Sequence, residues 1–434
     1  MRHRRPPMRL VFHLTPHRIA LLTFLAFYLI LICDVRHWSW RDPGSYFFNP
    51  EHAFDRVYSL RRETEAENYI TASSATGAGN HHVAKAGPSP SLCVGVPTVQ
   101  RDGTRYFRRA LGSVLEGLTV QEREDLFVMP FIVNVDPEQH EAYNEPWLEK
   151  LVDQVLTYKD AGDEAVGRVK ELMATDVDNK KKALFDYTHL LRTCYEINTA
   201  WTLILEDDTV AADGWYQRTS NALRQLEHNS DFDKALYLRL FYNERLLGWN
   251  GEEWLSYTIR TVLFIASIFA ALTLASRHLP SGRDICTPLT IATITLLICP
   301  MLIILFFLAG RLTVAGPSTG LNRMEAYGCC SQAFVFPRPQ IPDLLTWYEQ
   351  HFEKPYIDPV THTEQTQVDS LTEVWAEEKG LGRWALTPSV FQHVGGKSTK
   401  PMNAAQWGRT NVENIWNFGF ERLDGDRLRK EHVG

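Results

Sequence analysis

The chain has 434 residues, of which 22% are charged, and its formal net charge is −7. This length allows a substantial hydrophobic core and roughly two or three domains, and the acidic balance excludes a protein built as a whole to bind nucleic acid. The mean hydropathy is mildly negative, but this average conceals three concentrated apolar stretches.

The first apolar stretch, residues 19–35, has the features of an N-terminal membrane anchor. Five arginines precede it, and Trp38 and Trp40 follow it at the depth of a membrane interface. A basic flank, an apolar run and an aromatic belt predict a transmembrane helix after a cytosolic tail, residues 1–18. A cleaved signal peptide is the alternative, but no small-residue cleavage site follows the run.

Two further apolar runs, residues 259–275 and 289–310, lie in the middle of the chain. Each approaches the roughly 20 residues that a helix needs to cross a bilayer. The short loop between them carries Arg277 and Arg283, and the positive-inside rule places such a loop in the cytosol, with the flanking polar regions on the opposite side. A buried helical hairpin in a soluble domain is the alternative. The expected boundaries are 258–276 and 288–310 for the two helices and 277–287 for the loop.

Between the anchor and the first predicted strand, residues 36–90 are expected to form a stem that ends in a linker rich in Gly, Pro and Ser. Strands and helices then alternate in two parts, residues 91–257 and 311–434, on either side of the membrane hairpin. This alternation predicts an α/β fold with a mostly parallel sheet and helices on both faces. The expected strands are 91–98, 126–135, 201–205, 235–242, 329–336 and 389–393, and the expected helices are 106–118, 180–197, 340–353 and 368–379.

Four cysteines lie outside the predicted membrane helices and their loop, namely Cys93, Cys194, Cys329 and Cys330. A lumenal compartment permits disulfides, but the sequence does not fix how these four pair. The adjacent Cys329 and Cys330 have no His or Cys at metal-ligand spacing beside them, so we expect them to form structural bridges to two different partners.

The predicted strand at 201–205 runs directly into three consecutive carboxylates, Glu206, Asp207 and Asp208. Open α/β sheets bind their ligands at the carboxyl ends of the strands, and carboxylate oxygens suit Mg²⁺ or Mn²⁺, which can hold the diphosphate of a nucleotide. We expect Asp208 to bind the metal directly, with Asp207 as a second candidate ligand and Glu206 nearer the ribose. The alternative is an acidic turn that caps the following helix.

Four motifs in order along the chain resemble a known family. They are V-G-V-P-T-V-Q-R at 94–101, K-x-x-x-D-Y at 182–187, L-E-D-D at 205–208 and S-V-F-Q-H-V-G at 389–395. Together they resemble the GT-A core of N-acetylglucosaminyltransferase IV. The membrane hairpin inserted between the two halves of the domain departs from that enzyme and resembles the Golgi GPI N-acetylgalactosamine transferases, the post-GPI attachment to proteins factor 4 family. The resemblance implies a GT-A fold interrupted by a transmembrane hairpin.

The resemblance also implies a UDP-sugar donor and assigns residues to its site. Pro97, Thr98 and Arg101 end the first strand, where the uracil and the ribose are expected to lie. These three residues are therefore candidates for binding the nucleotide.

Two further groups of donor-site residues follow from the same resemblance. Lys182, Asp186 and Tyr187 lie on the helix that leads into the acidic strand, where Asp186 and Tyr187 are expected to touch the nucleotide; packing and capping are the alternative roles. His393 and Lys397 follow the last strand and are expected to contact the diphosphate. His393 is also a candidate metal ligand, although a single histidine is otherwise a core residue.

An inverting transfer needs one carboxylate that accepts the proton of the acceptor hydroxyl. The resemblance assigns this role to Asp369, at the start of a predicted helix, with the neighbouring Glu364 as its substitute. An N-terminal helix cap is the alternative for Asp369. Glu373 and Trp375, on the same helix, are expected to line the acceptor groove.

These assignments imply a metal-dependent, inverting glycosyltransferase that moves N-acetylgalactosamine from UDP-GalNAc to the mannose core of GPI anchors, with Mn²⁺ or Mg²⁺ as its metal and the glycan of GPI-anchored proteins as its acceptor. They also imply a Golgi membrane protein with three spans, a cytosolic N-terminus and a lumenal catalytic domain. The alternatives are an N-acetylglucosaminyl- or galactosyltransferase acting on N-glycans or glycolipids, and a membrane protein that kept a GT-A-like fold without activity. An inserted hairpin would hold the active site near an acceptor that is itself tethered by lipid.

Overall fold

The structure is a computed structural model, and it describes residues 15–75, 84–101, 103–176, 178–279, 282–324, 329–396 and 411–433. The chain divides into two compact units. One contains residues 1–53 and 247–316, and the other contains residues 54–246 and 317–434. The first unit holds the apolar stretches and the second holds the sheet.

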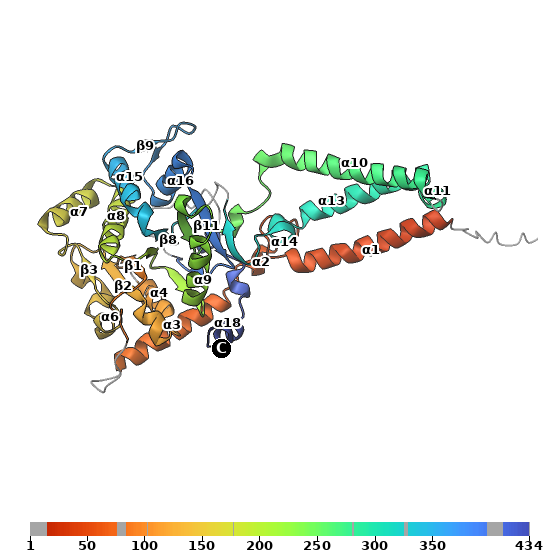
Figure 1. Ribbon diagram of the computed structural model, residues 1–434. Helices are drawn as coiled ribbons and strands as arrows, with labels where there is room; N and C mark the ends of the chain where they lie inside the picture. Colours follow the sequence, from red (N-terminus) through yellow and green to blue (C-terminus); the bar gives the residue numbers. More distant parts are fainter. Residues whose placement is uncertain are drawn as a thin grey trace, which may run out of the picture. The chain divides into compact units, whose positions relative to one another are not determined.

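Within the described residues of the first unit, three helices are long and apolar enough to cross a membrane. These are α1 (Pro16–Ser39), α10 (Trp254–His278), and a third span that comprises α12 (Pro288–Thr293), the π-helical segment η6 (Ile294–Ile298) and α13 (Cys299–Leu308), all drawn in Figure 1. Pro300 has no amide hydrogen to donate to the preceding turn, which accounts for the irregular hydrogen bonding just before it. Short helices complete the unit: α2 (Pro50–Ala53), α11 (Gly282–Ile285) and α14 (Arg311–Ala315).

The N-terminal anchor is tied to the third span within this unit. The hydroxyl of Tyr28, on α1, donates to the carbonyl oxygen of Met301 at 2.8 Å. Just after α1, the buried carboxylate of Asp42 accepts hydrogen bonds from the amide and the hydroxyl of Thr313, at 2.8 and 3.1 Å. Hydrogen bonds therefore join the anchor and the segment that follows it to the inserted hairpin and the helix after it, and we call these helices the membrane bundle.

The second unit is built on an eight-stranded sheet, which is mixed but mostly parallel. Strands β3, β2, β1 and β4 run parallel, β8 runs antiparallel to both β4 and β6, β11 is parallel to β6, and β7 is an antiparallel edge. In spatial order the strands are β3 (Leu156–Thr157), β2 (Leu126–Ile132), β1 (Leu92–Thr98), β4 (Trp201–Leu205), β8 (Ala333–Pro337), β6 (Ala235–Arg239), β11 (Gly382–Thr387) and β7 (Gly320–Arg323).

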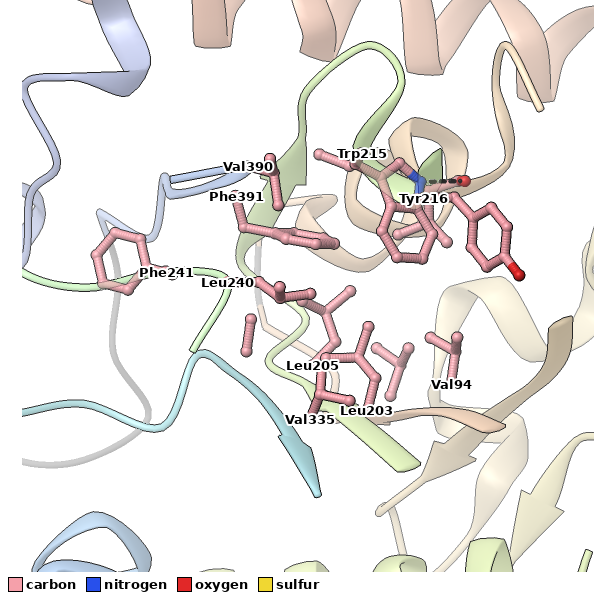
Figure 2. Close-up of a cluster of buried hydrophobic side chains, with 14 of the residues drawn as sticks. Val94, Leu203, Leu205, Trp215, Tyr216, Leu240, Phe241, Val335, Val390 and Phe391 are labelled. Carbon is pink, nitrogen blue, oxygen red and sulfur yellow. Dashed lines mark hydrogen bonds between the residues drawn. The ribbon is translucent and has the colours of Figure 1, made fainter. Parts of the chain in front are cut away.

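Helices cover both faces of this sheet, because side chains along each strand alternate between two cores. Val94 faces a core that includes Trp215 and Phe391, whereas Cys93 and Ile204 face a second core. Figure 2 shows the first of these cores. The first core is covered by α3 (Tyr58–Ala75), α4 (Tyr106–Leu115), α6 (Pro146–Leu151) and α9 (Trp215–Glu227), and the second by α7 (Asp163–Thr175), α8 (Lys180–Glu196), α15 (Ile341–Glu353) and α16 (Val368–Lys379).

Each expected strand and helix of the sheet unit is present, with small shifts at the ends. The last expected strand does not join the main sheet: β12 (Phe391–His393) pairs antiparallel with β5 (Thr209–Ala211), which follows the acidic motif. A second small ladder joins β9 (Tyr356–Ile357) to β10 (Glu364–Gln365). The remaining helices are α5 (Val120–Glu124), α17 (Asn411–Asn414) and α18 (Gly425–Val433).

The region that we expected to be a stem contributes α3 to the sheet unit. Helix α3 packs against α4, and its Arg62 side chain is fully buried. The Arg62 guanidinium donates to Glu116 and Asp213 and to the carbonyl oxygen of Ala211. These carboxylates come from separate segments of the chain. Their pairing with Arg62 offsets the cost of burying its charge and ties α3 to the sheet unit.

The disulfides correct one expectation. Cys93 pairs with Cys194, which links β1 to α8, and Cys329 pairs with its neighbour Cys330. The expectation that the adjacent cysteines bridge to two different partners is therefore wrong. The physical reason is that Cys93 and Cys194 satisfy each other, which leaves the adjacent pair to bond together in the loop before β8.

Candidate donor and metal site

The acidic motif lies at the edge of the sheet where β1 and β4 end. The Asp207 carboxylate is buried and accepts hydrogen bonds from the Thr98 hydroxyl at 2.7 Å and from Arg101 Nη1 at 2.7 and 2.8 Å. Burial raises the pKa of the Asp207 carboxyl above its usual value, although the Arg101 charge opposes this effect. Asp207 therefore fixes the Arg101 guanidinium at this edge, and its oxygens are engaged in that ion pair rather than turned toward a metal.

A histidine that the sequence analysis missed supports this ion pair through a hydrogen bond with Thr98. The amide of Ala142 donates to His140 Nδ1 at 3.3 Å, so Nε2 carries the ring proton and donates to the Thr98 hydroxyl at 3.0 Å. Burial, and secondarily the charge of Arg101, lower the pKa of His140 to about 4. His140 is therefore neutral at physiological pH and fixes the direction in which Thr98 donates to Asp207.

A hollow opens beside the ion pair. The Arg101 guanidinium lies 5.6 Å from the centre of the Tyr106 ring, and the Tyr106 hydroxyl accepts a hydrogen bond from the amide of Gly396 at 2.8 Å. A cation next to an aromatic face suits a nucleotide, because the base can stack and the phosphates can pair with the charge. The lining includes Thr98, Arg101, Tyr106, Arg108, His140 and Asp207.

Asp208 and His393 meet across the ladder of β5 and β12. His393 pairs with Thr209 in this ladder, and the amide of Val394 donates to the carbonyl oxygen of Asp208 at 2.8 Å. As a result, His393 Nε2 lies 3.5 Å from Asp208 Oδ2. Burial opposes the charge on Asp208, but the attraction of His393 outweighs it and holds the pKa of the Asp208 carboxyl below its usual value.

The residues around Asp208 fit a divalent metal. Asp208 Oδ1 is buried and has no hydrogen-bond partner among the described residues. A Cβ atom added to Gly395 would lie only 2.2 Å from Asp208 Oδ2 and 2.8 Å from His393 Nε2, so glycine keeps this space open. A carboxylate oxygen and an imidazole nitrogen are ligands that Mn²⁺ accepts. Asp208 and His393 are therefore the residues that would hold the metal.

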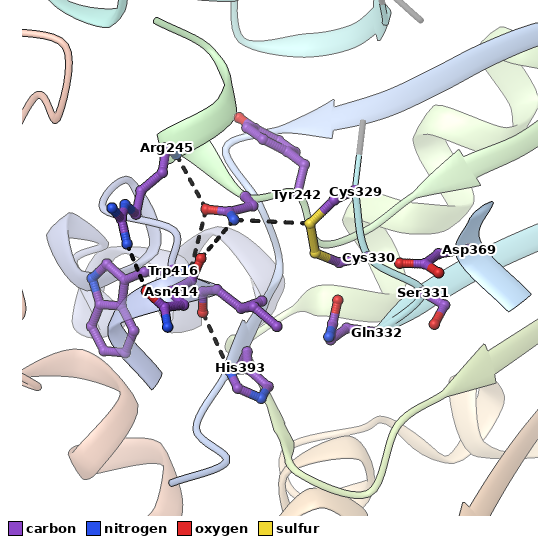
Figure 3. Close-up of a disulfide and its surroundings, with 12 residues drawn as sticks. Tyr242, Arg245, Cys329, Cys330, Ser331, Gln332, Asp369, His393, Asn414 and Trp416 are labelled. Carbon is purple, nitrogen blue, oxygen red and sulfur yellow. Dashed lines mark hydrogen bonds between the residues drawn. A yellow bond between two sulfur atoms is a disulfide. The ribbon is translucent and has the colours of Figure 1, made fainter. Parts of the chain in front are cut away.

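Glu206 turns toward the loop that precedes β8. Its two carboxylate oxygens accept hydrogen bonds from the Ser331 hydroxyl at 2.8 Å and from Gln332 Nε2 at 3.3 Å. The described part of that loop contains the Cys329–Cys330 disulfide, shown in Figure 3 with His393 and Asp369. Glu206, Ser331 and Gln332 thus form one polar cluster at the end of β4.

The three candidate residues on α8 differ in their surroundings. Lys182 Nζ donates to Asp186 at 2.7 Å and to the Tyr158 hydroxyl at 2.9 Å, and Tyr158 itself donates to Asp186. Lys182 and Asp186 therefore pair with each other in the interior, and burial raises the pKa of Asp186 despite the charge of Lys182. Tyr187 is also buried, but its hydroxyl has no partner among the described residues.

The candidate bases lie in different surroundings. Asp369 is half-buried in the first turn of α16 and accepts the amide of Ser370 at 2.8 Å; the residue that caps this helix is Gln367. Glu364 is exposed on β10. Pro97, in β1, is half-buried beside Thr98, and Lys397 falls outside the described residues.

Helix α16 also carries the two residues that we expected to line the acceptor groove. Trp375 is buried in the core beneath α16, because its position on the helix faces the sheet. The Glu373 carboxylate pairs with Arg239 at 2.6 Å and with Arg383 at 2.7 Å. The prediction for Trp375 is therefore wrong, and a role of Glu373 in the acceptor groove stays a prediction.

A second group of acids, Glu65, Glu116 and Asp213, lies close enough together to suggest a metal site. However, Arg62 pairs with all three carboxylates, at 2.6, 2.6 and 3.2 Å. The Arg429 guanidinium also approaches Asp213 at 2.8 Å. Since two guanidinium groups neutralise this cluster, the acids at the end of β4 fit a metal better.

Comparison with known proteins identifies the family. No curated protein matches the chain. Residues 92–392 match the family described as GPI-N-acetylgalactosamine transferase PGAP4. This match begins with β1 and ends within β12, so it covers more than half of the chain, including both parts of the sheet and the membrane hairpin between them. The chain therefore belongs to the GPI-N-acetylgalactosamine transferases, which transfer N-acetylgalactosamine to the GPI anchor.

Proposed function

We propose that the chain carries out this transfer as a metal-dependent, inverting enzyme with UDP-GalNAc as its donor. The observation that carries the proposal is the pairing of Asp208 with His393 beside Gly395, where Asp208 Oδ1 has no partner among the described residues. The Arg101–Asp207 ion pair and its hollow lie at the same edge of the sheet. A diphosphate leaving group requires this combination of metal ligands and a fixed cation.

The residues around the hollow prepare the donor site before the substrate arrives. Mn²⁺ held by Asp208 and His393 would neutralise the charge that develops on the diphosphate. The Arg101 guanidinium supplies a second positive charge, and the chain of hydrogen bonds from His140 through Thr98 to Asp207 holds it in place. Donors fixed in advance stabilise a transition state without a cost of reorganisation.

Asp369 is the proposed base. Its Oδ1 accepts the Ser370 amide, and no described residue donates to Oδ2. Figure 3 draws Asp369 in one view with Cys330 and Ser331. As the bond between C1 of the sugar and the diphosphate oxygen breaks, the acceptor oxygen bonds to C1 from the opposite face, and its proton passes to Asp369. The product therefore has the inverted configuration at C1.

The proposed location is the Golgi membrane, with the sheet unit in the lumen. Three candidate spans support an N-terminus and a sheet unit on opposite sides of the membrane, and the arginines before α1 and between α10 and α12 favour the cytosol for those segments. The glycan of GPI-anchored proteins is the proposed acceptor.

The decisive experiment is a transfer assay with the purified full-length protein in detergent. UDP-GalNAc and a GPI glycan acceptor should give UDP and a product with the inverted anomeric configuration in the presence of Mn²⁺, and EDTA should stop the reaction. Full turnover in EDTA would refute the metal, and a product with retained configuration would refute the inverting mechanism. A panel of other UDP-sugars measured in parallel tests the donor.

A further inference from the structure

The cluster around Glu206 contains a buried acceptor with no donor. The Gln332 side chain is only 4% exposed, and its Nε2 donates to Glu206 Oε2 at 3.3 Å. Among the described residues none donates to Gln332 Oε1. The amide cannot turn over without placing its oxygen against the Glu206 carboxylate, so Oε1 is the atom left unpaired. An unpaired buried carbonyl is costly unless a ligand supplies a donor.

A buried donor with no acceptor among the described residues lies on α8, close enough to Glu206 to feel its charge. Tyr187 is 6% exposed, its ring packs edge-on against Tyr348 with centroids 6.0 Å apart, and its hydroxyl has no partner in the described parts of the chain. Burial, then Tyr348, then the charge of Glu206 raise the pKa of Tyr187 well above its usual value. The hydroxyl is therefore protonated and available to donate.

The described segment that carries Gln332, residues 329–332, is held by a disulfide and by hydrogen bonds. Cys329 and Cys330 are bonded to each other, and the buried Arg239 donates to the carbonyl oxygen of Cys329. The Ser331 hydroxyl donates to Glu206 at 2.8 Å. In Figure 3 Gln332 lies in this loop, in the same view as His393. Groups held this firmly are suited to recognition, because little freedom is lost on binding.

We propose that Gln332 and Tyr187 recognise the acetamido group of the transferred sugar. An acetamido group presents one N–H donor and one carbonyl acceptor, and among the described residues Gln332 Oε1 is a buried acceptor without a donor and the Tyr187 hydroxyl is a buried donor without an acceptor. A hydroxyl at that position carries its donor and its acceptor on one oxygen close to the ring, whereas the acetamido group carries them on two separate atoms and reaches further, so the hydroxyl pairs less well with two separate buried groups. The inference rests on the proposed function, since it places the donor sugar at the end of β4 beside the metal ligands.

The test compares two donors that differ only in this group, UDP-GalNAc and UDP-galactose. Gln332→Leu and Tyr187→Phe in the full-length protein should each lower kcat/KM for UDP-GalNAc by about 10- to 100-fold while leaving kcat/KM for UDP-galactose nearly unchanged. Tyr348→Phe is the matched control, because it removes another buried tyrosine hydroxyl, one paired with Thr372, from the same core. It should leave the ratio of the two donors unchanged.

Binding of UDP separates the possible outcomes. UDP lacks the sugar, so its affinity should be the same in Gln332→Leu, Tyr187→Phe and the unmodified protein. Equal losses on both donors, an unchanged ratio, or weaker UDP binding in both variants would overturn the inference, because the two side chains would then act through packing or through buried water. A protein that uses no UDP-hexosamine at all would instead refute the proposed function.

Discussion

His393 Nε2 lies 3.5 Å from Asp208 Oδ2, across the two-stranded ladder of β5 and β12. These residues come from the two parts of the chain that the membrane hairpin separates, so the candidate metal site exists only when both parts fold together. The ladder brings the two parts together directly, because it places the strand that follows the acidic motif beside the strand that carries the histidine. The site therefore depends on the pairing of two strands that are distant in the sequence, and neither motif forms it alone.

The first prediction concerns Asp208. Asp208→Ala should lower transfer by at least about 100-fold, because the lost carboxylate is a proposed ligand of the metal that neutralises the leaving group. The protein should remain folded and inserted in the membrane, as measured by thermal melting and membrane fractionation. Asp163→Ala removes an exposed carboxylate and serves as the control. Unimpaired turnover of Asp208→Ala would contradict the assignment.

The second prediction concerns pH. Burial lowers the pKa of His140 from 6.5 to about 4, with a smaller contribution from Arg101. The folded protein therefore binds fewer protons than the unfolded chain between these values, so this contribution to stability is present above pH 6.5 and is lost as the pH falls. Between pH 7 and pH 5 the loss is about 2 kcal/mol.

Denaturation in urea at several pH values measures this loss. The midpoint should fall from pH 7 to pH 5, and His140→Gln should flatten the dependence while lowering stability at pH 7. Identical pH dependence in the two proteins would show that His140 does not carry the effect.

Sequence patterns predicted five strands of the main sheet, β1, β2, β4, β6 and β8, because these segments are apolar, but β3, β7 and β11 were not predicted. The strand at 201–205 is apolar and ends in carboxylates, and alternation of side chains along β1 follows from the sheet itself. The role of His140 could not be predicted in this way. It follows a short 3-10 segment without a periodic pattern, and its function arises from the distant Thr98.

The structure of the stem and the pairing of the adjacent cysteines also could not be predicted from the local sequence. Residues 58–75 have a polar composition that resembles a solvated stem, yet Arg62 is buried there because Glu116 and Asp213 approach it from other segments. Likewise, the pairing of Cys329 with Cys330 depends on which other cysteines are already satisfied. Neither feature has a signal in the local sequence.

The third prediction concerns Glu421, a buried carboxylate that caps α3. Its Oε2 accepts the amides of Val57, Tyr58 and Ser59 at 2.9, 3.0 and 3.2 Å, and its Oε1 accepts Gln392 Nε2 at 3.0 Å. A negative charge at a helix N-terminus is favourable. Glu421→Gln should therefore lower the free energy of unfolding by about 1–3 kcal/mol.

The comparison for this prediction is Glu138→Gln, which changes an exposed glutamate. Thermal melting should show a clear decrease in Tm for Glu421→Gln and almost none for Glu138→Gln. A melting curve for Glu421→Gln that matches the unmodified protein would mean that α3 does not depend on this cap.

The fourth prediction concerns topology. If α1, α10 and the third span all cross the membrane, tags at the N-terminus and in the loop at 277–287 should be accessible in the cytosol, and tags near residues 91 and 425 should be protected in the lumen. Protease treatment of sealed vesicles, with and without detergent, measures this arrangement. Digestion of a tag near residue 425 without detergent would refute the three-span topology.

The last prediction concerns the inserted hairpin. The sheet unit is continuous with the membrane bundle at three points of the chain, after residue 53 and on both sides of residues 247–316. A GPI acceptor is itself tethered to the bilayer, so attachment of the enzyme beside it raises the local concentration of acceptor. Replacing residues 247–316 with a short flexible loop should therefore spare transfer to a soluble glycan fragment and strongly reduce transfer to GPI-anchored protein in membranes.

Asp369→Asn is the matched comparison, because loss of the proposed proton acceptor should lower both reactions together. Thermal melting must first show that the hairpin deletion leaves the sheet unit folded, since β6 and β7 flank the deleted segment. If the folded deletion protein loses both activities equally, the spans shape the fold of the enzyme rather than its access to the membrane. If only the membrane-bound reaction falls, the hairpin acts by keeping the enzyme where its lipid-tethered acceptor is concentrated.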